Sequence, residues 1–259
     1  MRLPIARSAA AIALCAAPLA FGADGELSLG TGINYTTGKY GESQSTSIVT
    51  IPILARYERD AWSFRATVPY LRISGPGTVI PGIGHAERRG GRAGTGTRTE
   101  SGMGDSTLSA SYTMYSGTTN RSGVGATGKL KLATGDEDRG LGTGSNDVSF
   151  QIDAFQEIER NTVFGVVGYT FFGDSSVVQL ENVANVGIGA SHRLDTGDSV
   201  GLAFDARQGA TPAPAPQREL TAFWNHKLER NWRTQAYFLK GFARGSPDWG
   251  LGINATVAF

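Results

Sequence analysis

The sequence predicts an all-β protein, a closed antiparallel up-and-down transmembrane β-barrel of about 12 strands that follows a cleaved N-terminal signal peptide. Three observations predict this fold. Segments with period-2 alternation recur along the chain, their connections alternate between short and long, and aromatic residues gather near the segment ends. The composition agrees, because 36 glycines and 40% hydrophobic residues suit many strands and turns better than a large helical core.

The first 23 residues differ from the rest of the chain. Arg2 and Arg7 give a positive start, residues 8–19 are small and apolar, and small residues offer a cleavage point after Gly22 or Ala23. This is the plan of a secretory signal peptide. We therefore expect a signal peptide at residues 1–23 and an exported barrel at residues 24–259.

Composition excludes several kinds of chemistry. The single cysteine, Cys15, lies in the signal peptide, so the mature chain has no disulfide, thiol nucleophile or cysteine-ligated metal. Loss of Arg2 and Arg7 leaves 22 basic against 23 acidic residues, and such a balance does not indicate a nucleic-acid partner. No apolar run after residue 23 approaches the roughly 18 residues of a spanning helix. A membrane barrel is still allowed, because its signal is alternation.

Twelve alternating segments can be assigned, most of them 10 to 13 residues long. Spanning β-strands need roughly 9–11 residues, whereas strands of globular proteins average roughly 5–6, so length favours the membrane. The segments are Glu26–Thr37, Thr46–Glu58, Trp62–Ile73, Asp105–Tyr115, Gly123–Thr134, Asp147–Ile158, Thr162–Gly173, Asn182–Leu194, Ser199–Gln208, Arg218–Glu229, Trp232–Ala243 and Asp248–Phe259.

The connections alternate in length. Short turns of a few residues follow the second, sixth, eighth and tenth segments, and longer pieces follow most odd-numbered segments, including 74–104 and 135–146. The short connection 244–247 breaks the trend. An even strand number with both ends on the short-turn side is typical of bacterial outer-membrane barrels.

The two faces of these segments differ in chemistry. In Asp147–Ile158, for example, Phe150 and Ile152 alternate with Gln151 and Asp153. A soluble β-protein also alternates, but here aromatic residues form two girdles, as expected at lipid–water interfaces. The girdle residues are Tyr57, Trp62, Trp232 and Phe259 at the short-turn end and Tyr35, Tyr70, Phe238 and Trp249 at the other end.

The segment Asp248–Phe259 ends on an unbroken apolar face. Lipid cannot satisfy backbone N–H and C=O groups, so the sheet must close and this segment must pair with the first. Its terminal aromatic, Phe259, resembles the recognition signal that outer-membrane barrels present to the barrel-assembly machinery. We therefore expect export through the periplasm to the bacterial outer membrane, with the lipid bilayer, lipopolysaccharide, that machinery and a small-molecule solute as partners.

Several stretches of turn and loop sequence resemble the outer-membrane family named after the MetA-pathway of phenol degradation, often described as transporters. The resemblance covers most of the mature chain and implies a β-barrel that passes small, including aromatic, molecules. The resemblance does not assign any binding residues to this chain. The stretches are 50–84, 101–112, 128–153, 168–174 and 240–252.

The inward set of the predicted barrel is polar and bears both charges. One interpretation is an ion-pair lattice that fills or braces the lumen, and the other is a charged constriction that selects solutes. About eight strands give a filled interior and 16 a water channel, so we expect a narrow or plugged pore. The lumen candidates are Arg56, Arg65, Lys129, Lys131, Asp153, Glu157, Asp205, Arg207 and Arg233.

The longest connection, 74–104, is the candidate gate. Loops of this length are usually functional or disordered. It either folds into the barrel or lies outside near anionic lipopolysaccharide, and its SGPGTVIPG part is expected to be ordered by its Pro and Gly residues. The gating candidates are Arg88, Arg89, Arg92 and Arg98.

The connection 135–146 (GDEDRGLGTGSN) carries two weak signals. It lacks the ligand and glycine positions of a calcium loop, and no helix or GK[ST] follows its glycines, as a phosphate loop requires. We expect a solvated turn, and neither metal nor cofactor.

Catalysis is not expected either. Alternation places His192 and His226 on the apolar face near the short-turn end, His85 lies in the long loop, and neither HExxH nor GxSxG occurs.

Three functions follow from these predictions. The first is an outer-membrane channel for small solutes by passive diffusion. Its narrower form takes aromatic or hydrophobic compounds into the barrel and releases them through a lateral opening near Pro52 and Pro69, since proline cannot donate to the ladder. The second is a structural or adhesive barrel with a filled lumen, and the third is an outer-membrane hydrolase.

Overall fold

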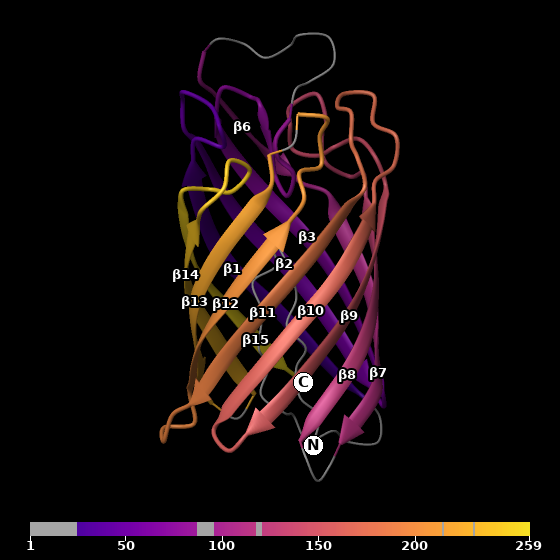
Figure 1. Ribbon diagram of the computed structural model, residues 1–259, viewed down its shortest axis with the longest axis vertical. Helices are drawn as coiled ribbons and strands as arrows, with labels where there is room; N and C mark the ends of the chain where they lie inside the picture. The colour runs from indigo at the N-terminus through magenta and orange to yellow at the C-terminus, as the bar shows by residue number, and fades with distance from the viewer. Residues whose placement is uncertain (1–24, 87–95, 118–120, 214, 230) are drawn as a thin grey trace.

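The computed structural model describes residues 25–86, 96–117, 121–213, 215–229 and 231–259 (Figure 1). The predicted signal peptide lies outside these residues and stays a prediction. The described residues contain no helix that is long and apolar enough to cross a membrane.

The structure is a single tall barrel of antiparallel strands (Figure 1). A minor two-stranded sheet pairs β4 with β5. The strands are β1 (Glu26–Gly38), β2 (Thr46–Arg59), β3 (Trp62–Gly75), β4 (Val79–Ile80), β5 (Gly84–His85), β6 (Arg98–Met103), β7 (Ser106–Gly117), β8 (Ser122–Leu132), β9 (Asp147–Ile158), β10 (Asn161–Phe171), β11 (Val183–Arg193), β12 (Ser199–Arg207), β13 (Gln217–Lys227), β14 (Trp232–Gly241) and β15 (Trp249–Ala258).

The large sheet has 13 segments but 12 strand positions, because β6 and β7 pair successively with the upper and lower parts of β3. A bulge at Gly104–Asp105 separates them, and the Gly104 amide keeps the wall continuous by donating to the Pro69 carbonyl at 2.8 Å. β1 pairs with β15 along its length, from Ser28 opposite Ala258 to Thr37 opposite Trp249. The barrel is therefore closed, as membrane insertion requires, and β6, which among the described strands pairs only with β3, leaves an edge just at the rim.

The predicted segments match the barrel strands to within two residues at each end. The prediction was wrong in one region. The expected loop 74–104 contains β6, which continues the line of β7, and it contains the small β4–β5 sheet.

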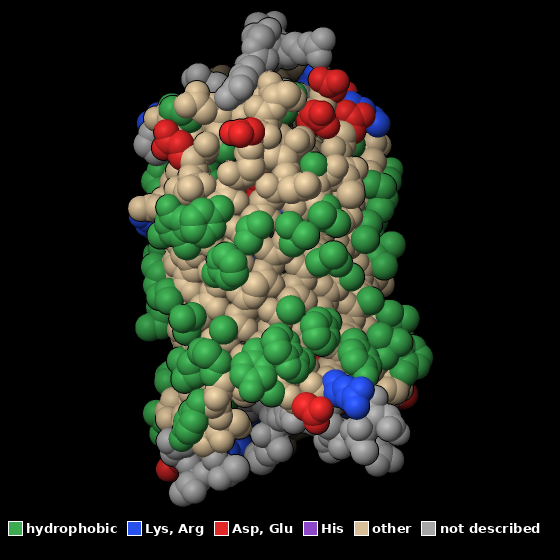
Figure 2. Space-filling view, turned by 90° about the vertical axis from the view of Figure 1, so that its right-hand side faces the viewer, with side chains coloured by type: hydrophobic (Ala, Val, Ile, Leu, Met, Phe, Trp, Pro, Cys, Tyr) green, Lys and Arg blue, Asp and Glu red, His purple; other side chains and the backbone are tan. Residues whose placement is uncertain are grey.

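The outward face is apolar and the inward face mostly polar, as the alternation predicted. Phe150 and Ile152 are outward and more than half exposed, whereas Asp153 and Glu157 of the same strand are buried inside. Figure 2 shows hydrophobic side chains over the height of the barrel on the face in view, with acidic side chains gathered above them. A surface this apolar on a closed barrel faces lipid.

The girdle aromatics lie outward as predicted. At the short-turn end the Trp62 ring lies 4.8 Å from the Tyr112 ring, and at the other end the Tyr35 ring lies 5.3 Å from that of Trp249. The start of β1 and the C-terminus lie at the short-turn end, while β6 lies at the opposite mouth with the long connections (Figure 1). Long loops mark the extracellular side of such barrels.

Candidate functional site: the inner wall and the extracellular mouth

All nine lumen candidates occupy inward positions of their strands. Arg56 is held at the short-turn end of the lumen, where its guanidinium pairs with Glu58 and donates from Nε to Ser63 Oγ at 3.1 Å. Arg65 lies directly opposite Arg56 across the β2–β3 ladder. This end of the lumen therefore carries charges of both signs within hydrogen-bond reach of one another.

Glu157 is also braced. Its carboxylate pairs with Arg121 and lies 3.9 Å from Arg193, and its side chain is buried to 1% exposure. A carboxylate this buried needs its cations, because an unpaired buried charge is costly. On this side of the barrel the ion-pair lattice describes the geometry better than a free charged ring.

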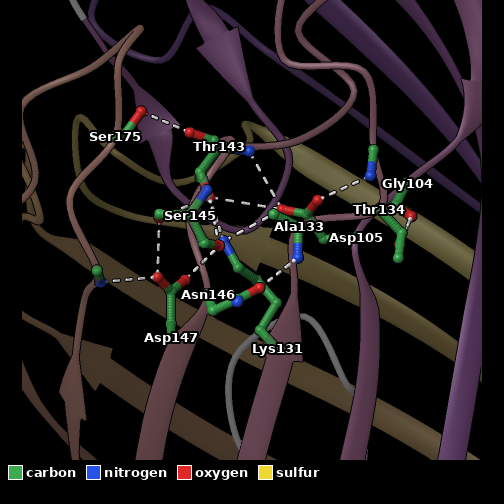
Figure 3. Close-up of polar contacts among 12 residues, drawn as sticks. Gly104, Asp105, Lys131, Ala133, Thr134, Thr143, Ser145, Asn146, Asp147 and Ser175 are labelled. Carbon is green, nitrogen blue, oxygen red and sulfur yellow. Dashed lines mark hydrogen bonds and ion pairs between the residues drawn. The ribbon is translucent and has the colours of Figure 1, made fainter.

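Lys131 has a different setting, because it lies beneath the extracellular mouth (Figure 3). Its Nζ lies 2.6 Å from Asp147 Oδ2 and 3.1 Å from Asp105 Oδ2, and it also contacts the Thr143 hydroxyl. Asp147 comes from β9, while Asp105 comes from the bulge between β6 and β7. One ammonium group thus joins three neighbouring parts of the wall.

The same network folds the connection 135–146 inward (Figure 3). Asp105 accepts from the amides of Gly135 at 3.0 Å and Thr143 at 3.1 Å, and Asp147 accepts from Ser145 Oγ at 3.0 Å. Thr143 and Ser145 are buried. The expectation of a solvated turn was therefore wrong for the second half of this connection, although Asp136 at its start is exposed.

A second inward element crosses the mouth. Segment 76–86, which carries the β4–β5 sheet, reaches the opposite wall, where the Ile83 carbonyl accepts from Arg207 Nη2 at 3.2 Å and lies 3.5 Å from Gln217 Nε2. Gly84 follows with a φ of +91°, and a Cβ there would lie 2.7 Å from the Gly245 carbonyl oxygen. Only glycine fits this close approach in a left-handed conformation.

Segment 76–86 places apolar side chains in the mouth, where they belong to two clusters. The first cluster joins Val79 to wall and loop residues on the β2–β3 side, and the second joins Ile80 and Ile83 to the β10–β13 side. The first consists of Tyr40, Ile48, Leu71, Ile73, Val79 and Leu141. The second consists of Ile80, Ile83, Ala86, Val178, Val183 and Ala210, with Phe172, Val177 and Leu180 packed against it.

These clusters change which residues of the connection 74–104 are expected to form a gate. Arg88, Arg89 and Arg92 lie outside the described residues. Arg98 begins β6 and pairs with Gly75 of β3, so its backbone belongs to the rim of the wall, and its gating role stays a prediction. Among the described residues of this connection, the apolar residues Val79, Ile80 and Ile83 enter the mouth. A signal was present in the sequence, since these residues form the apolar part of an otherwise Gly-, Pro- and Arg-rich connection.

A family profile described as "Putative MetA-pathway of phenol degradation" matches residues 21–258. The chain belongs to this family. No curated protein sequence matches it.

Solved structures share the fold of this family member at low identity. The COG4313 outer membrane channel from Pseudomonas putida F1 is 16% identical with a TM-score of 0.72, covering 93% of this chain and 97% of that one. The KdgM porin is 8% identical with a TM-score of 0.56, covering 90% and 99%. The β domain of the Bordetella autotransporter BrkA is 11% identical with a TM-score of 0.55, covering 92% and 100%. The fold is therefore that of bacterial outer-membrane barrels.

The histidines of this MetA-pathway family member have interfacial or rim positions. His226 Nδ1 lies 2.8 Å from Asp198 Oδ1, and His192 Nδ1 lies 2.9 Å from Asn161 Oδ1, both at the short-turn end as predicted. His85 lies in the inward segment, 2.9 Å from Glu42. The described part of the chain holds no group of three or more His, Cys, Asp or Glu residues placed to bind a metal ion.

The two candidate prolines face each other across the β2–β3 ladder. The β1–β2 pairing is interrupted opposite Pro52, between Thr31 and Asn34. On the other side, the β3 pairing changes from β6 to β7 at Pro69. The β2–β3 hairpin is thus bordered at one level by two interrupted seams.

Proposed function

We propose that this protein is an outer-membrane channel that passes small apolar or aromatic solutes by passive diffusion. The observation that carries the proposal is the apolar mouth. Segment 76–86 and the walls on both sides of it offer aliphatic and aromatic side chains, from Tyr40 and Leu71 to Ile83 and Val183. Sites for small molecules are mostly apolar with a few placed polar groups, and here Arg207 and Gln217 are such groups.

The lumen below the mouth favours a narrow path. Charged side chains of both signs line it, and pairs such as Arg56–Glu58 hold them against the wall. Twelve strands lie between a filled barrel and a wide aqueous pore. We expect small solutes to pass and larger hydrophilic ones to be excluded.

A lateral route is the narrower form of the same function. The seams at Pro52 and Pro69 lie beside the first apolar cluster, and the position of a Gly104 Cβ would be 2.5 Å from Leu71 Cδ1. An apolar solute held at Leu71 is therefore separated from lipid by a glycine-containing seam. Release into the membrane at this seam would bypass the charged lower lumen.

A structural or adhesive barrel is the alternative. The anchoring of segment 76–86 and the buried Glu157 ion pairs favour it, because both fill the lumen. The two functions predict opposite results in a planar bilayer.

The deciding experiment uses refolded residues 24–259. We expect small single-channel currents that benzyl alcohol reduces with increasing concentration, while glucose at the same concentration has no such effect. Replacing residues 79–85 with a Gly-Ser segment of equal length should raise the conductance and remove the effect of benzyl alcohol. Absence of current from both proteins, with native heat-modifiable migration on gels, would contradict a pore and support the filled barrel.

Export and assembly complete the proposal. We infer that the chain is cleaved after Gly22 or Ala23, and that the strand ending at Phe259 is presented to the barrel-assembly machinery. The exposed upper loops would then meet lipopolysaccharide. Intact-mass measurement of the protein isolated from outer membranes tests the cleavage position.

A further inference from the structure

The lipid-facing wall has a hollow that runs across β1, β2, β3, β7, β8 and β9, from Leu27 and Tyr57 near the short-turn end to Leu130 and Val148. Its volume is about 640 Å³. Small outward residues adjoin one another there, since Ala55 lies opposite Ala66 and Ala110 lies opposite Gly128. Gly128 opens directly onto it, because a Cβ at that position would find its nearest neighbour, Phe150 Cε1, only at 4.0 Å.

Aromatic rings border this hollow towards the short-turn end. The rings of Trp62 and Phe64 are stacked at 5.9 Å with an angle of 8°, and Tyr112 lies 4.8 Å from Trp62. Such rings are typical of the membrane–water interface. The hollow therefore begins at the level of the lipid headgroups and extends towards the hydrocarbon.

Arg59 supplies a cation at the level of these aromatic rings. Arg59 follows Tyr57 and Ala55 on the outward side of β2 and lies directly opposite Trp62. Its side chain is 63% exposed, and its Nε is 3.9 Å from Asp60 Oδ2, too far for a hydrogen bond. A guanidinium in this setting matches the geometry and charge of a phosphate.

We propose that this hollow binds a phospholipid of the periplasmic leaflet, with its phosphate on Arg59 and one acyl chain over Ala66, Ala110 and Gly128. The short-turn end fixes the leaflet, since short turns face the periplasm in these barrels. Charge complementarity selects a phosphate-bearing lipid over a second copy of the chain.

A second hollow, on another part of the wall, serves as a control for lipid binding. A hollow of about 690 Å³ lies across β11 to β14 and also contains small outward residues, among them Ala222. Near its short-turn end, His226 is 2.8 Å from Asp198, Arg160 pairs with Asp195, and the His192 imidazole, which lines the hollow, is hydrogen-bonded to Asn161. The two hollows are thus similar in volume and in their apolar lining, but they differ in whether an arginine is available to bind a phosphate.

The test is native mass spectrometry of refolded residues 24–259 titrated with dioleoylphosphatidylglycerol. We expect one lipid to bind the wild-type protein above background. Arg59→Gln should weaken binding about fivefold, the usual effect of one cation at a membrane surface. The double change Ala66→Leu and Gly128→Leu should abolish binding by filling the hollow, whereas Ala222→Leu should leave it unchanged.

Two results would overturn the proposal. One is equal binding by the wild-type and Arg59→Gln proteins, which would leave only non-specific adhesion of lipid. The other is a lipid-free dimer that the double change dissociates, which would assign the hollow to a second copy. Heat-modifiable gel migration checks that every variant is folded, and the result does not depend on whether the barrel conducts.

Discussion

The ammonium group of Lys131 lies 2.6 Å from a carboxylate oxygen of Asp147 and 3.1 Å from one of Asp105, under a connection that both acids help to fold. Lys131→Met would leave two neighbouring carboxylates without their shared cation. We expect a loss of about 3 kcal/mol in the free energy of unfolding, the usual result of removing one partner of a buried pair. Urea titration of the barrel in detergent micelles measures it.

A double-mutant cycle isolates the contact. If Lys131 and Asp147 act on each other, Lys131→Met combined with Asp147→Asn should cost clearly less than the sum of the single changes, by at least about 0.5 kcal/mol. Simple additivity would contradict the direct contact. Hydrogen exchange at residues 141–145 should accelerate in each single variant.

Gly84 fixes segment 76–86 in the mouth. In Gly84→Ala the added methyl would meet the Gly245 carbonyl at 2.7 Å, so we expect the segment to leave its position and the conductance to rise. The control is Gly82→Ala, whose φ of +78° imposes comparable backbone strain but whose Cβ would meet nothing within 4 Å. An equal rise in both variants would mean that strain alone is responsible.

Ionisation of Asp198 makes the stability of the periplasmic rim depend on pH. Burial acts to raise its pKa, but hydrogen bonds from His226 and Trp224 outweigh burial, so the pKa is lowered from its ordinary 3.8. Because the carboxylate form is favoured in the folded state, its stabilising contribution is present above pH 3.8 and is lost as the pH falls through the lower, folded pKa. We expect Asp198→Asn to be less stable than wild type at pH 7.

The difference between these two proteins should shrink below pH 3.8. Emission from Trp224, whose Nε1 donates to Asp198 at 3.2 Å, offers a local probe once the other tryptophans are replaced by phenylalanine. A constant difference between pH 7 and pH 2.5 would exclude ionisation of Asp198 as its cause.

The outward position of Ile152 can be tested against its inward neighbour. Ile152→Arg would place a charge in lipid near the middle of β9 and should lower the stability of the inserted barrel by about 2–4 kcal/mol. Gln151→Arg, one residue earlier, points into the polar lumen and should cost much less. Equal costs in folding titrations into lipid vesicles would contradict the assignment of faces.

The barrel strands were predictable because each carries its own signal. Lipid on one face and polar lumen on the other impose alternation within a single segment, as Phe150 and Asp153 illustrate, and no long-range contact is needed to see it. One strand escaped this rule. β6 (RTESGM) lies at the rim beyond the apolar belt, so lipid imposes no alternation on it, and its pairing with β3 alone makes it a strand.

The mouth was harder to predict because its contacts are long-range. Ile80 and Ile83 pack against Val178, Val183 and Ala210, roughly 100 residues later in the chain, and no local pattern announces this packing. Leu141 is similar, a lone apolar residue in a polar connection that is buried only through its cluster with Leu71 and Ile73. Apolar residues within an otherwise polar connection, several at 79–83 and one at Leu141, are the usable signal in both cases.

The seam between β1 and β15 has a consequence for biogenesis. The first strand to leave the ribosome pairs with the last, and it must wait until more than 200 residues have been made and exported, since Ser28 meets Ala258. During that delay the growing sheet has two bare edges, each able to pair with another chain. Loss of the hydrogen bonds that the amides of Ala258 and Phe259 donate to the carbonyls of Asn231 and Leu27 would prolong the exposure of these edges at the final step. Release of the chain before β1 has paired with β15 is therefore a greater risk for this fold than weak packing.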